Sequence, residues 1–226
     1  GSTGNRTVFA KWTINEYSIT FDKNGGTGTM DDQVVTYNAS VTLTANAFTR
    51  NGYTFGGWAL SAAGSVEYAD QESYTMGAQN VTLYAIWNPI EYTITYNLYE
   101  GTNDYDNPVT YTIESNTITF ADPTKTGYTF GGWYLEDQFT TEIETIAQGS
   151  TGNKTVFAKW TANSYTVILD KQGGTGGSDQ VEPTFDAAMP DGALAPTRTG
   201  YDFGGYYSSP DGEGEQYYTA DMVSAD

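Results

Sequence analysis

The sequence predicts a mainly β protein (α+β in class) built from small tandem units. Each unit is expected to hold a mostly antiparallel or mixed sheet with at most short helical turns, at 77–79 and 185–189. Three observations lead to this fold class: a repeat of about 74 residues, alternating apolar and polar segments, and glycine-rich turns. The repeat is marked by landmarks that share one pair of spacings, 87−12=75 and 160−87=73. They are Trp12, Trp87 and Trp160, then Tyr17, Tyr92 and Tyr165, then Gly52, Gly127 and Gly200.

The landmarks also predict the domain boundaries. Residues 1–12 are expected to be the closing strand of a preceding repeat, because GSTGNRTVFAKW matches GSTGNKTVFAKW at 149–160 except for Arg6 in place of Lys154. No Met precedes Gly1, so the chain is expected to be a segment of a longer protein. The three repeats that follow are predicted at 13–87, at 88–160 and, without its closing strand, at 161–226.

The first segment of each repeat alternates apolar and hydroxyl residues, as in 17–21 (YSITF) and 92–96 (YTITY). Such alternation is typical of a strand with one buried face. Asn24-Gly25-Gly26 follows the first of these segments and favours a hairpin turn, because glycine tolerates positive φ. A second strand is therefore expected at 33–37 and at 108–111.

The closing segment of each repeat is expected to be a strand that covers the core of its own repeat. Its core-facing residues in repeat 1 are Val81, Leu83, Ala85 and Trp87. We therefore expect Trp87 and Trp160 to be mostly buried against the GYTFGGW segment. An aromatic residue recurs on the opposite face, at Phe9, Tyr84 and Phe157.

The segment GYTFGGW at 52–58 recurs at 127–133 and returns as GYDFGGY at 200–206. A phosphate cradle would need a helix start after the glycines and usually a Lys, and neither follows here. We interpret the segment instead as a strand that begins after a turn closed by glycine. The pair Gly56-Gly57 is expected to form a bulge that directs Trp58 into the core.

Composition excludes several classes of function. The 226 residues include 9 Lys and Arg against 28 Asp and Glu, a formal net charge of −19. Nucleic acids and anionic membranes bind through basic patches, so neither is expected as a partner. Cys and His are absent, which removes thiolate nucleophiles, the commonest general base and the commonest metal ligands. No enzyme activity and no catalytic, cofactor-binding or metal-ligating residue is predicted, and no apolar run is long enough to span a membrane.

Two chemical alternatives stay open. The loops at 103–107 and 211–215 are rich in oxygen ligands, but they lack the order of an EF-hand and do not recur in all repeats. Solvated loops are the favoured interpretation over calcium sites. An isopeptide crosslink between Lys and Asn is also open, since Lys11 and Lys159 carry no distinctive signature. An intact mass short by one ammonia would reveal it.

Taken together, these motifs resemble the Listeria–Bacteroides repeat family, which includes the B-repeat of internalin-type surface proteins. Residues 123–134 (PTKTGYTFGGWY) follow the pattern best, and 196–206 follow it closely. Repeat 1 departs with Ala47-Phe48 where Pro is usual, and repeat 3 has Tyr206 in place of the Trp. The resemblance covers nearly the whole chain. It implies a small β-grasp-like sheet of about four strands with a short helical segment, in units strung in tandem on bacterial surface or secreted proteins.

The predicted function is that of a structural segment (stalk, spacer or filament component) of a secreted or cell-surface bacterial protein. The alternative is a glycan- or host-receptor-binding adhesin module that uses exposed tyrosines. A binder needs an aromatic platform open to water, whereas a spacer needs the recurrent aromatics, Tyr84 and Phe157 among them, buried or at junctions between repeats. The expected partners are neighbouring repeats, or other copies of the chain arranged head-to-tail.

The ends of the segment suggest how copies would join. Repeat 3 reaches 217–222, the counterpart of the run before Val81, and stops short of a closing strand. An unpaired sheet edge recruits a strand from elsewhere. Residues 7–12 of another copy, or of the preceding stretch of a longer chain, are the best match. We therefore expect β-strand addition, which would build an open filament because the contact is heterologous.

Overall fold

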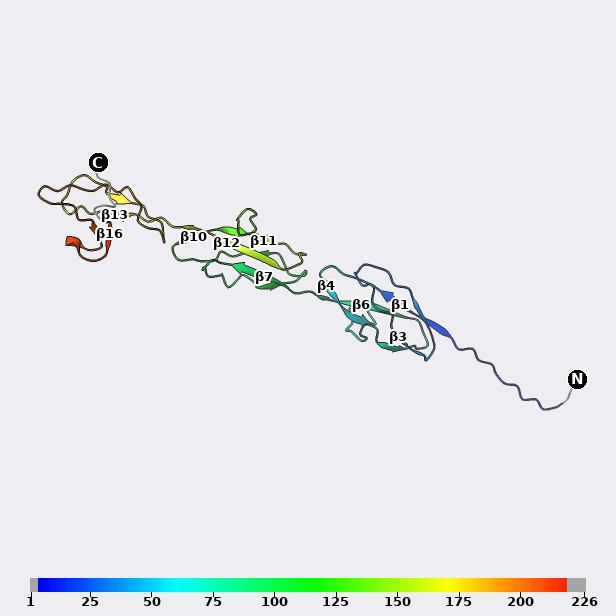
Figure 1. Cartoon of the computed structure of the whole chain (residues 1–226). Coiled ribbons are helices and arrows are strands. Elements are labelled where there is room, and N and C mark those ends of the chain that lie inside the picture. The colour runs from blue at the N-terminus through cyan, green and yellow to red at the C-terminus, as the bar shows by residue number, and fades with distance from the viewer. Residues whose placement is uncertain (1–3, 219–226) are drawn as a thin grey trace. The chain divides into compact units, whose positions relative to one another are not determined.

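The computed structural model describes residues 4–218. Within them the chain is almost entirely strand, which confirms the mainly β class, and the one helical element is the 3-10 helix η1 (Pro210–Gly212). The strands, labelled where room allows in Figure 1, are β1 Glu16–Asp22, β2 Gln33–Thr36, β3 Ser40–Thr42, β4 Tyr53–Ala59, β5 Ser73–Thr75, β6 Val81–Pro89, β7 Tyr92–Asn97, β8 Thr110–Tyr111, β9 Ile118–Thr119, β10 Tyr128–Tyr134, β11 Thr145–Ile146, β12 Lys154–Ala162, β13 Val167–Ile168, β14 Gln180–Val181, β15 Tyr206–Tyr207 and β16 Gln216–Tyr218.

The chain forms two compact units. Among the described residues, the first holds 4–93, 110–117 and 147–152, and the second holds 94–109, 118–146 and 153–218. The first unit therefore contains repeat 1 together with the part of repeat 2 that packs on it. The second contains the rest of repeat 2 together with repeat 3.

Repeat 1 is built on a mixed sheet with the strand order β2-β1-β6-β4. β1 pairs antiparallel with β2, with Tyr17 opposite Val35. The centre of the sheet is the parallel pair of β1 with β6, in which Phe21 lies opposite Leu83. β4 runs antiparallel to β6 at the other edge. The closing strand β6 thus lies in the middle of the sheet, although it comes last in the repeat.

Repeat 2 has the same arrangement, in the order β10-β12-β7-β8. Its closing strand β12 runs parallel to β7, with Val156 opposite Tyr96, and antiparallel to β10, with Ala158 opposite Trp133. The two halves of this sheet, β7 with β8 on one side and β10 on the other, are joined only through β12. A closing strand therefore unites each sheet.

The glycine pair of GYTFGGW forms the predicted bulge. The register between β4 and β6 shifts between Phe55 and Gly57, and the register between β10 and β12 shifts in the equivalent place. Gly57 has φ 131° and Gly132 has φ 108°, a region that L side chains rarely adopt. The extra residue reverses the alternation of the strand, so Trp58 points to the core.

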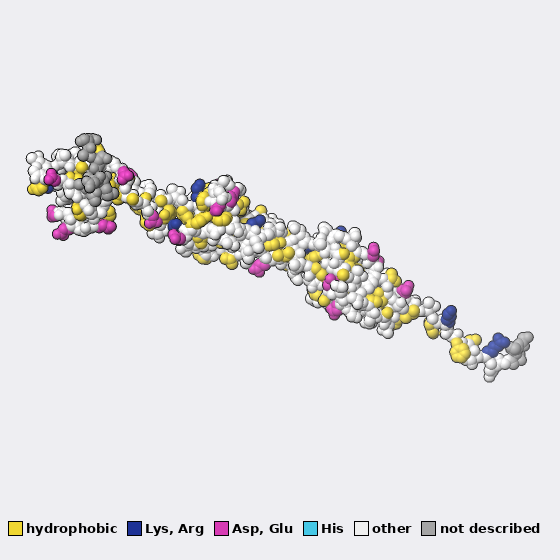
Figure 2. Space-filling view, viewed as in Figure 1, with side chains coloured by type: hydrophobic (Ala, Val, Ile, Leu, Met, Phe, Trp, Pro, Cys, Tyr) yellow, Lys and Arg dark blue, Asp and Glu magenta, His cyan; other side chains and the backbone are white. Residues whose placement is uncertain are grey.

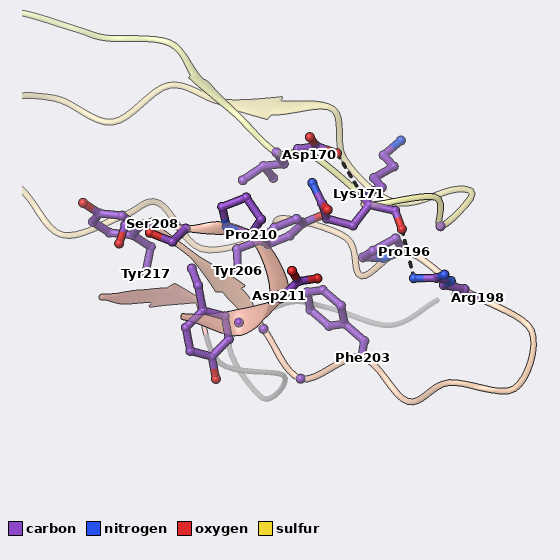
Figure 3. A pocket seen from close by; sticks show the side chains of 18 of the residues that line it. Asp170, Lys171, Pro196, Arg198, Phe203, Tyr206, Ser208, Pro210, Asp211 and Tyr217 are labelled. Atoms are coloured by element: carbon purple, nitrogen blue, oxygen red, sulfur yellow. Dashed lines mark hydrogen bonds between the residues drawn. The ribbon is translucent and has the colours of Figure 1, made fainter. Parts of the chain in front are cut away.

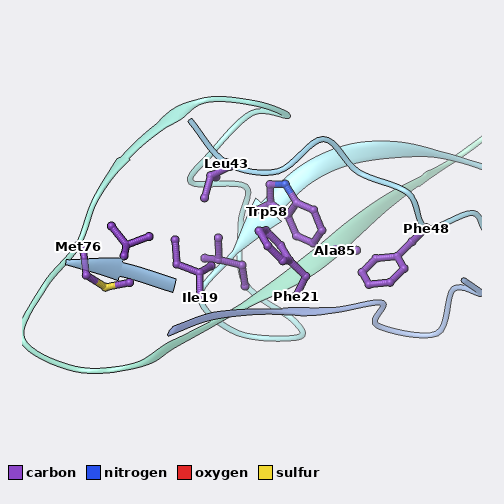
Figure 4. Close-up of a cluster of buried hydrophobic side chains, with 9 residues drawn as sticks. Ile19, Phe21, Leu43, Phe48, Trp58, Met76 and Ala85 are labelled. Atoms are coloured by element: carbon purple, nitrogen blue, oxygen red, sulfur yellow. The ribbon is translucent and has the colours of Figure 1, made fainter. Parts of the chain in front are cut away.

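Trp58 is the centre of the core of repeat 1 and is fully buried. Figure 4 shows its ring among Ile19, Phe21, Leu43 and Ala85. The ring centroids of Trp58 and Phe21 lie 4.8 Å apart, and the tilted geometry is one that aromatic pairs favour. Leu83 and Ala85 of the closing strand are buried in the same cluster, as expected from their shared face.

The closing tryptophans differ from the expectation that they are mostly buried. Trp87 and Trp160 are half-buried. Each packs edge-on against the phenylalanine of its own GYTFGGW strand, Trp87 on Phe55 at 5.7 Å and Trp160 on Phe130 at 5.5 Å. Trp87 Nε1 also donates a hydrogen bond to the carbonyl of Lys23 at 3.0 Å. The bulge directs the other tryptophan inward, so the closing tryptophan caps the end of the core instead of filling it.

The expected helical turns are not formed. Residues 77–79 form a bend and 185–189 a turn followed by irregular backbone. Asp186 has φ 58°, a left-handed conformation that ends any right-handed helix, and Gly77 is a poor helix former. Besides its main sheet, repeat 1 has the antiparallel pair of β3 and β5, and repeat 2 has the pair of β9 and β11.

Repeat 3 differs from the other two because its described strands form two separate pairs, β13 with β14 and β15 with β16. In repeats 1 and 2 the closing strand connects the equivalent parts. Tyr206 replaces the core tryptophan and is buried with Leu169, Val181 and Tyr218. The predicted run at 219–222 lies outside the described residues.

Candidate functional site

The glycine turn before each GYTFGGW-type strand is the candidate site, because two successive repeats meet there. All three glycines adopt a left-handed conformation: φ is 77° at Gly52, 78° at Gly127 and 81° at Gly200. The following tyrosine lies beneath the basic side chain three residues earlier in each turn. The distances from the cation to the ring centroid are 4.0 Å for Arg50 on Tyr53, 4.3 Å for Lys125 on Tyr128 and 4.3 Å for Arg198 on Tyr201. This cation–π contact holds the tyrosine ring against its own turn.

The first compact unit contains the junction of repeats 1 and 2. The carbonyl of Gly52 accepts a 2.9 Å hydrogen bond from the amide of Ile90. A Cβ atom on Gly52 would lie 2.7 Å from Ile113 Cδ1, so Ile113 packs directly on the bare backbone. The hydroxyl of Tyr53 donates to Glu114 Oε1 at 2.8 Å. This hydrogen bond is the main reason why the pKa of Tyr53 is raised above its ordinary value.

The second compact unit contains the same junction between repeats 2 and 3. The carbonyl of Gly127 accepts a 2.9 Å hydrogen bond from the amide of Asn163. The ring of Phe185 lies against Gly127 so closely that an added Cβ would collide with it. Tyr128 donates to Asp186 Oδ2 at 3.2 Å and packs edge-on against Phe185 at 5.6 Å. Burial and the hydrogen bond to Asp186 raise the pKa of Tyr128. The two junctions therefore use the same contacts.

The third turn has the same internal construction but lacks such a contact. A Cβ on Gly200 would meet no atom of the described residues within 4 Å. Tyr201 is 67% exposed, whereas Tyr53 and Tyr128 are half-buried. Its cation–π partner Arg198 is nevertheless in place. The turn of repeat 3 therefore has the form of the turns that make a junction, but no described residue receives it.

The receiving residues were missed at the sequence level. Ile113 and Glu114 receive the first turn, and Phe185 and Asp186 receive the second. In repeats 2 and 3 an apolar residue followed by a carboxylate stands at the same position of the repeat. This pattern is a weak signal, because acidic residues are frequent throughout the chain. Only the strand register brings this pair next to the turn of the preceding repeat.

A cavity of about 760 Å³ lies in repeat 3, between its two separate strand pairs. Figure 3 shows Phe203, Tyr206 and Tyr217 near its walls, with Asp170 and Lys171 on the opposite side. Much of the apolar lining comes from β13 with the residues just after it and from the GYDFGGY segment, and it includes Val167, Leu169, Phe203 and Tyr206. Those are the segments whose equivalents in repeat 2, β7 and β10, flank the closing strand β12. The cavity thus occupies the place of a closing strand.

Residues 7–12 carry the sequence of a closing strand but form no strand within the described part of the chain. Val8 is 88% exposed and Trp12 is 89% exposed. Figure 2 shows hydrophobic side chains standing out along this N-terminal stretch. In repeat 2 the equivalent of Val8, Val156, is fully buried, and the equivalent of Trp12, Trp160, is half-buried. This stretch is therefore a closing strand without a sheet.

The other loops noted in the sequence have structural explanations. Within residues 4–218, no three Asp, Glu, His or Cys side chains gather in a way that could hold a metal ion. In the loop at 103–107, Asn107 is buried and its amide donates to Asn103 Oδ1 at 2.8 Å and to the carbonyl of Ala121 at 3.0 Å. The polar groups of this loop are thus used to hold the loop itself. In the loop at 211–215, Asp211 is exposed and lies in η1.

The remaining residues of interest lie apart from the junctions. Tyr84 and Phe157, the recurrent aromatics of the second face, are both half-buried. Lys159 places its ammonium over the ring of Tyr134, 5.3 Å from the centroid, and Lys11 is exposed. Across residues 4–218, no helix has the length and apolar character needed to cross a bilayer.

The fold and the junctions define a tandem-repeat β protein whose units are joined by recurrent glycine turns. The family model of the Listeria-Bacteroides repeat domain matches residues 17–86, 92–159 and 165–226. The chain belongs to this family, and the resemblance of its motifs is confirmed.

Relatives carry the same kind of sequence. A protein of Evansella cellulosilytica, provisionally named a membrane protein, is 30% identical over 223 residues, which cover 97% of this chain and 32% of the relative. Internalin H of Listeria monocytogenes is 30% identical over 152 residues, covering 64% of this chain and 27% of internalin H. The chain thus spans about a third or less of these relatives. Among solved structures, domains 3–4 of the Streptococcal High Identity Repeats in Tandem from a cell surface protein match 65% of this chain and 98% of theirs. They share 13% identity with a TM-score of 0.25, too weak a likeness to support an argument.

Proposed function

We propose that the chain is a structural spacer segment of a secreted or cell-surface bacterial protein. The observation that carries the proposal is the junction built twice from the same parts: a left-handed glycine under an apolar side chain, and a tyrosine hydroxyl bonded to a carboxylate. A joint repeated in this way restricts bending between neighbouring repeats. Internalin H and the provisionally named membrane protein of Evansella cellulosilytica support the surface or secreted location.

The proposal includes assembly head-to-tail by strand complementation. The cavity of repeat 3 lies where a closing strand would join its two strand pairs. Residues 7–12 (TVFAKW) repeat the sequence of 155–160, which is the closing strand of repeat 2. Insertion would bury Val8 and give the edges of β13 and the GYDFGGY segment main-chain partners. Burying one valine side chain contributes about 1.5–3 kcal/mol.

The register in repeats 1 and 2 gives a sharp test of this insertion. Thr129 lies opposite Thr161 in repeat 2, and by the spacing of the landmarks the equivalent pair is Asp202 with Thr13. Residues opposite each other in antiparallel strands are close enough for a disulfide. The chain has no Cys, so single substitutions introduce the only thiols. The experiment mixes a Thr13→Cys variant with an Asp202→Cys variant under mild oxidation and measures the mixed dimer by mass spectrometry.

The mixed disulfide is expected to form readily between these two variants. Ser208→Cys is the matched control, because Ser208 is exposed in the same repeat but out of register with Thr13. If Thr13→Cys reacts no better with Asp202→Cys than with Ser208→Cys, strand complementation between copies is wrong. The spacer function within a longer chain would then depend on the junctions alone.

Glycan or host-receptor binding stays a prediction. Tyr84 and Phe157, the recurrent aromatics of the second face, are half-buried, which favours neither an open platform nor a closed core. A glycan array probed with the intact chain tests the alternative, and reproducible binding to one sugar class would support it over the spacer.

A further inference from the structure

Tyr37 and Asn38 hold the place in repeat 1 that receives a turn in the other repeats. Ile19 pairs with Gln33 in repeat 1, the Ile94 amide bonds the Val109 carbonyl in repeat 2, and Val167 pairs with Val181 in repeat 3. Four residues after each partner stand Tyr37, Ile113 and Phe185, and the next residues are Asn38, Glu114 and Asp186. Ile113 and Phe185 cover the glycine of a preceding turn, and Glu114 and Asp186 accept a tyrosine hydroxyl.

The backbone around Tyr37 repeats that of the receiving site in repeat 3. The amide of Tyr37 donates to the carbonyl of Asn15 at 2.9 Å, as the amide of Phe185 donates to Asn163 at 2.8 Å. Asn38 has φ 62° and its counterpart Asp186 has φ 58°. Tyr37 is nevertheless 46% exposed, whereas Ile113 and Phe185 are half-buried under a turn. Repeat 1 therefore presents a formed receiving surface that no described residue covers.

Strand insertion would bring this surface to the turn of repeat 3, which has no partner among the described residues. The carbonyl of Gly127 accepts a hydrogen bond from Asn163, which stands three residues after Trp160. Asn15 stands three residues after Trp12, so a strand at 7–12 inserted in a second copy would carry Asn15 to the carbonyl of Gly200. Tyr37, bonded to Asn15, would then lie over Gly200.

We infer that Tyr37 and Asn38 form a docking surface for the Gly200-Tyr201 turn of a second copy of this chain. The inference rests on the proposed strand complementation and adds a second contact to it. Arg198 already lies over the ring of Tyr201 at 4.3 Å, so the turn is ordered before docking and loses less conformational freedom on binding. Asn38 Oδ1 accepts the hydroxyl of Tyr201, in place of the carboxylate used in the other two junctions.

The test measures self-association of the intact chain by sedimentation velocity over a range of concentrations. Tyr37→Ala is expected to weaken association about tenfold, as truncation of a central aromatic does. Tyr37→Phe is expected to keep the wild-type affinity, because a phenylalanine fills this place in repeat 3. Asn38→Asp is expected to tighten association about threefold, since it restores the carboxylate acceptor. The matched control is Tyr105→Ala, which removes a tyrosine that is 92% exposed in a loop of repeat 2.

A second measurement separates this inference from the proposed function. A synthetic peptide of residues 5–16 is titrated into the intact chain by calorimetry, and it can insert as a strand but carries no Tyr37. Wild type and Tyr37→Ala are expected to bind the peptide equally. If wild type and Tyr37→Ala both bind the peptide, and the two proteins also self-associate with equal affinity, the docking surface is wrong and strand complementation stands. If neither the peptide binds nor the wild-type chain associates, strand complementation is wrong and the docking surface falls with it.

Discussion

The hydroxyl of Tyr53 donates a 2.8 Å hydrogen bond to Glu114, a residue of the following repeat 61 positions further along the chain. Tyr128 makes the same bond to Asp186. In each case the acceptor directly follows the apolar residue that covers the glycine before the tyrosine. One short turn thus makes both a packing contact and a hydrogen bond with the following repeat. The packing contact stabilises the junction, and the hydrogen bond makes it specific.

The first prediction concerns this hydrogen bond. Tyr53→Phe and Glu114→Gln should each lower the free energy of unfolding of the first compact unit slightly. The double variant should lower it by less than the sum of the two single losses. We expect a coupling of about 0.5 kcal/mol, because the bond is exposed to solvent. Urea unfolding of wild type and the three variants gives this coupling free energy. Strictly additive losses would mean that the bond contributes nothing to the joint.

The second prediction concerns the two kinds of tryptophan. Trp58→Ala should lower the free energy of unfolding of repeat 1 by about 3–5 kcal/mol, because it empties the centre of the core. Trp87→Ala should lower the free energy of unfolding clearly less, because the ring of Trp87 is only half-buried. Thermal unfolding followed by circular dichroism compares the two. Equal losses would contradict the assignment of the core.

The third prediction concerns the bulge. A Cβ on Gly57 would lie 2.5 Å from Val66 Cγ1 and 2.7 Å from the carbonyl of Tyr68, and the backbone there has φ 131°. Gly57→Ala should therefore cost more than about 1 kcal/mol. Gly77→Ala is the matched control, because nothing lies within 4 Å of its Cβ position, and it should stay within about 0.5 kcal/mol of wild type. Equal melting temperatures for the two variants would show that the bulge tolerates a side chain.

The fourth prediction concerns alkaline pH. Burial raises the pKa of Tyr96 from 10.0 to about 12, and its hydroxyl donates to the carbonyl of Pro108 at 2.9 Å. The folded state thus favours the neutral phenol. The resulting stabilisation is fully present below the unfolded pKa near 10 and is lost as pH rises toward 12. Between pH 10 and 12, the urea midpoint of wild type should fall more steeply with pH than that of Tyr96→Phe. Equal slopes for the two proteins would contradict a contribution from Tyr96.

Much of the fold could be predicted from the sequence, because it follows from local pattern. The repeat, the alternating strands and the glycine bulge at Gly56-Gly57 all depend on neighbouring residues, and the structure bears them out. The burial of Trp87 could not be predicted in the same way. The bulge puts Trp58 in the centre of the core, and Trp87 lies half-buried beside Phe55.

The junctions depend on information that local pattern does not carry. Glu114 is one of 28 acidic residues, and nothing near it in sequence marks it as the acceptor of Tyr53. Its place follows from the register of β7 and β8 and from the path of the chain between repeats. The helical turn expected at 185–189 was wrong for a related reason, since Asp186 takes a left-handed conformation beside the turn of repeat 2.

The central position of the closing strand has a consequence for the order in which the protein is made. In repeat 1, Ile19 pairs with Val81, so the parallel pair at the middle of the sheet joins residues that are 81−19=62 positions apart. A repeat emerging from a ribosome or a secretion channel cannot complete its sheet until its last residues have appeared. Such distant pairing is slow to form. Each repeat is therefore expected to fold in a single late step, after the residues of its closing strand have appeared.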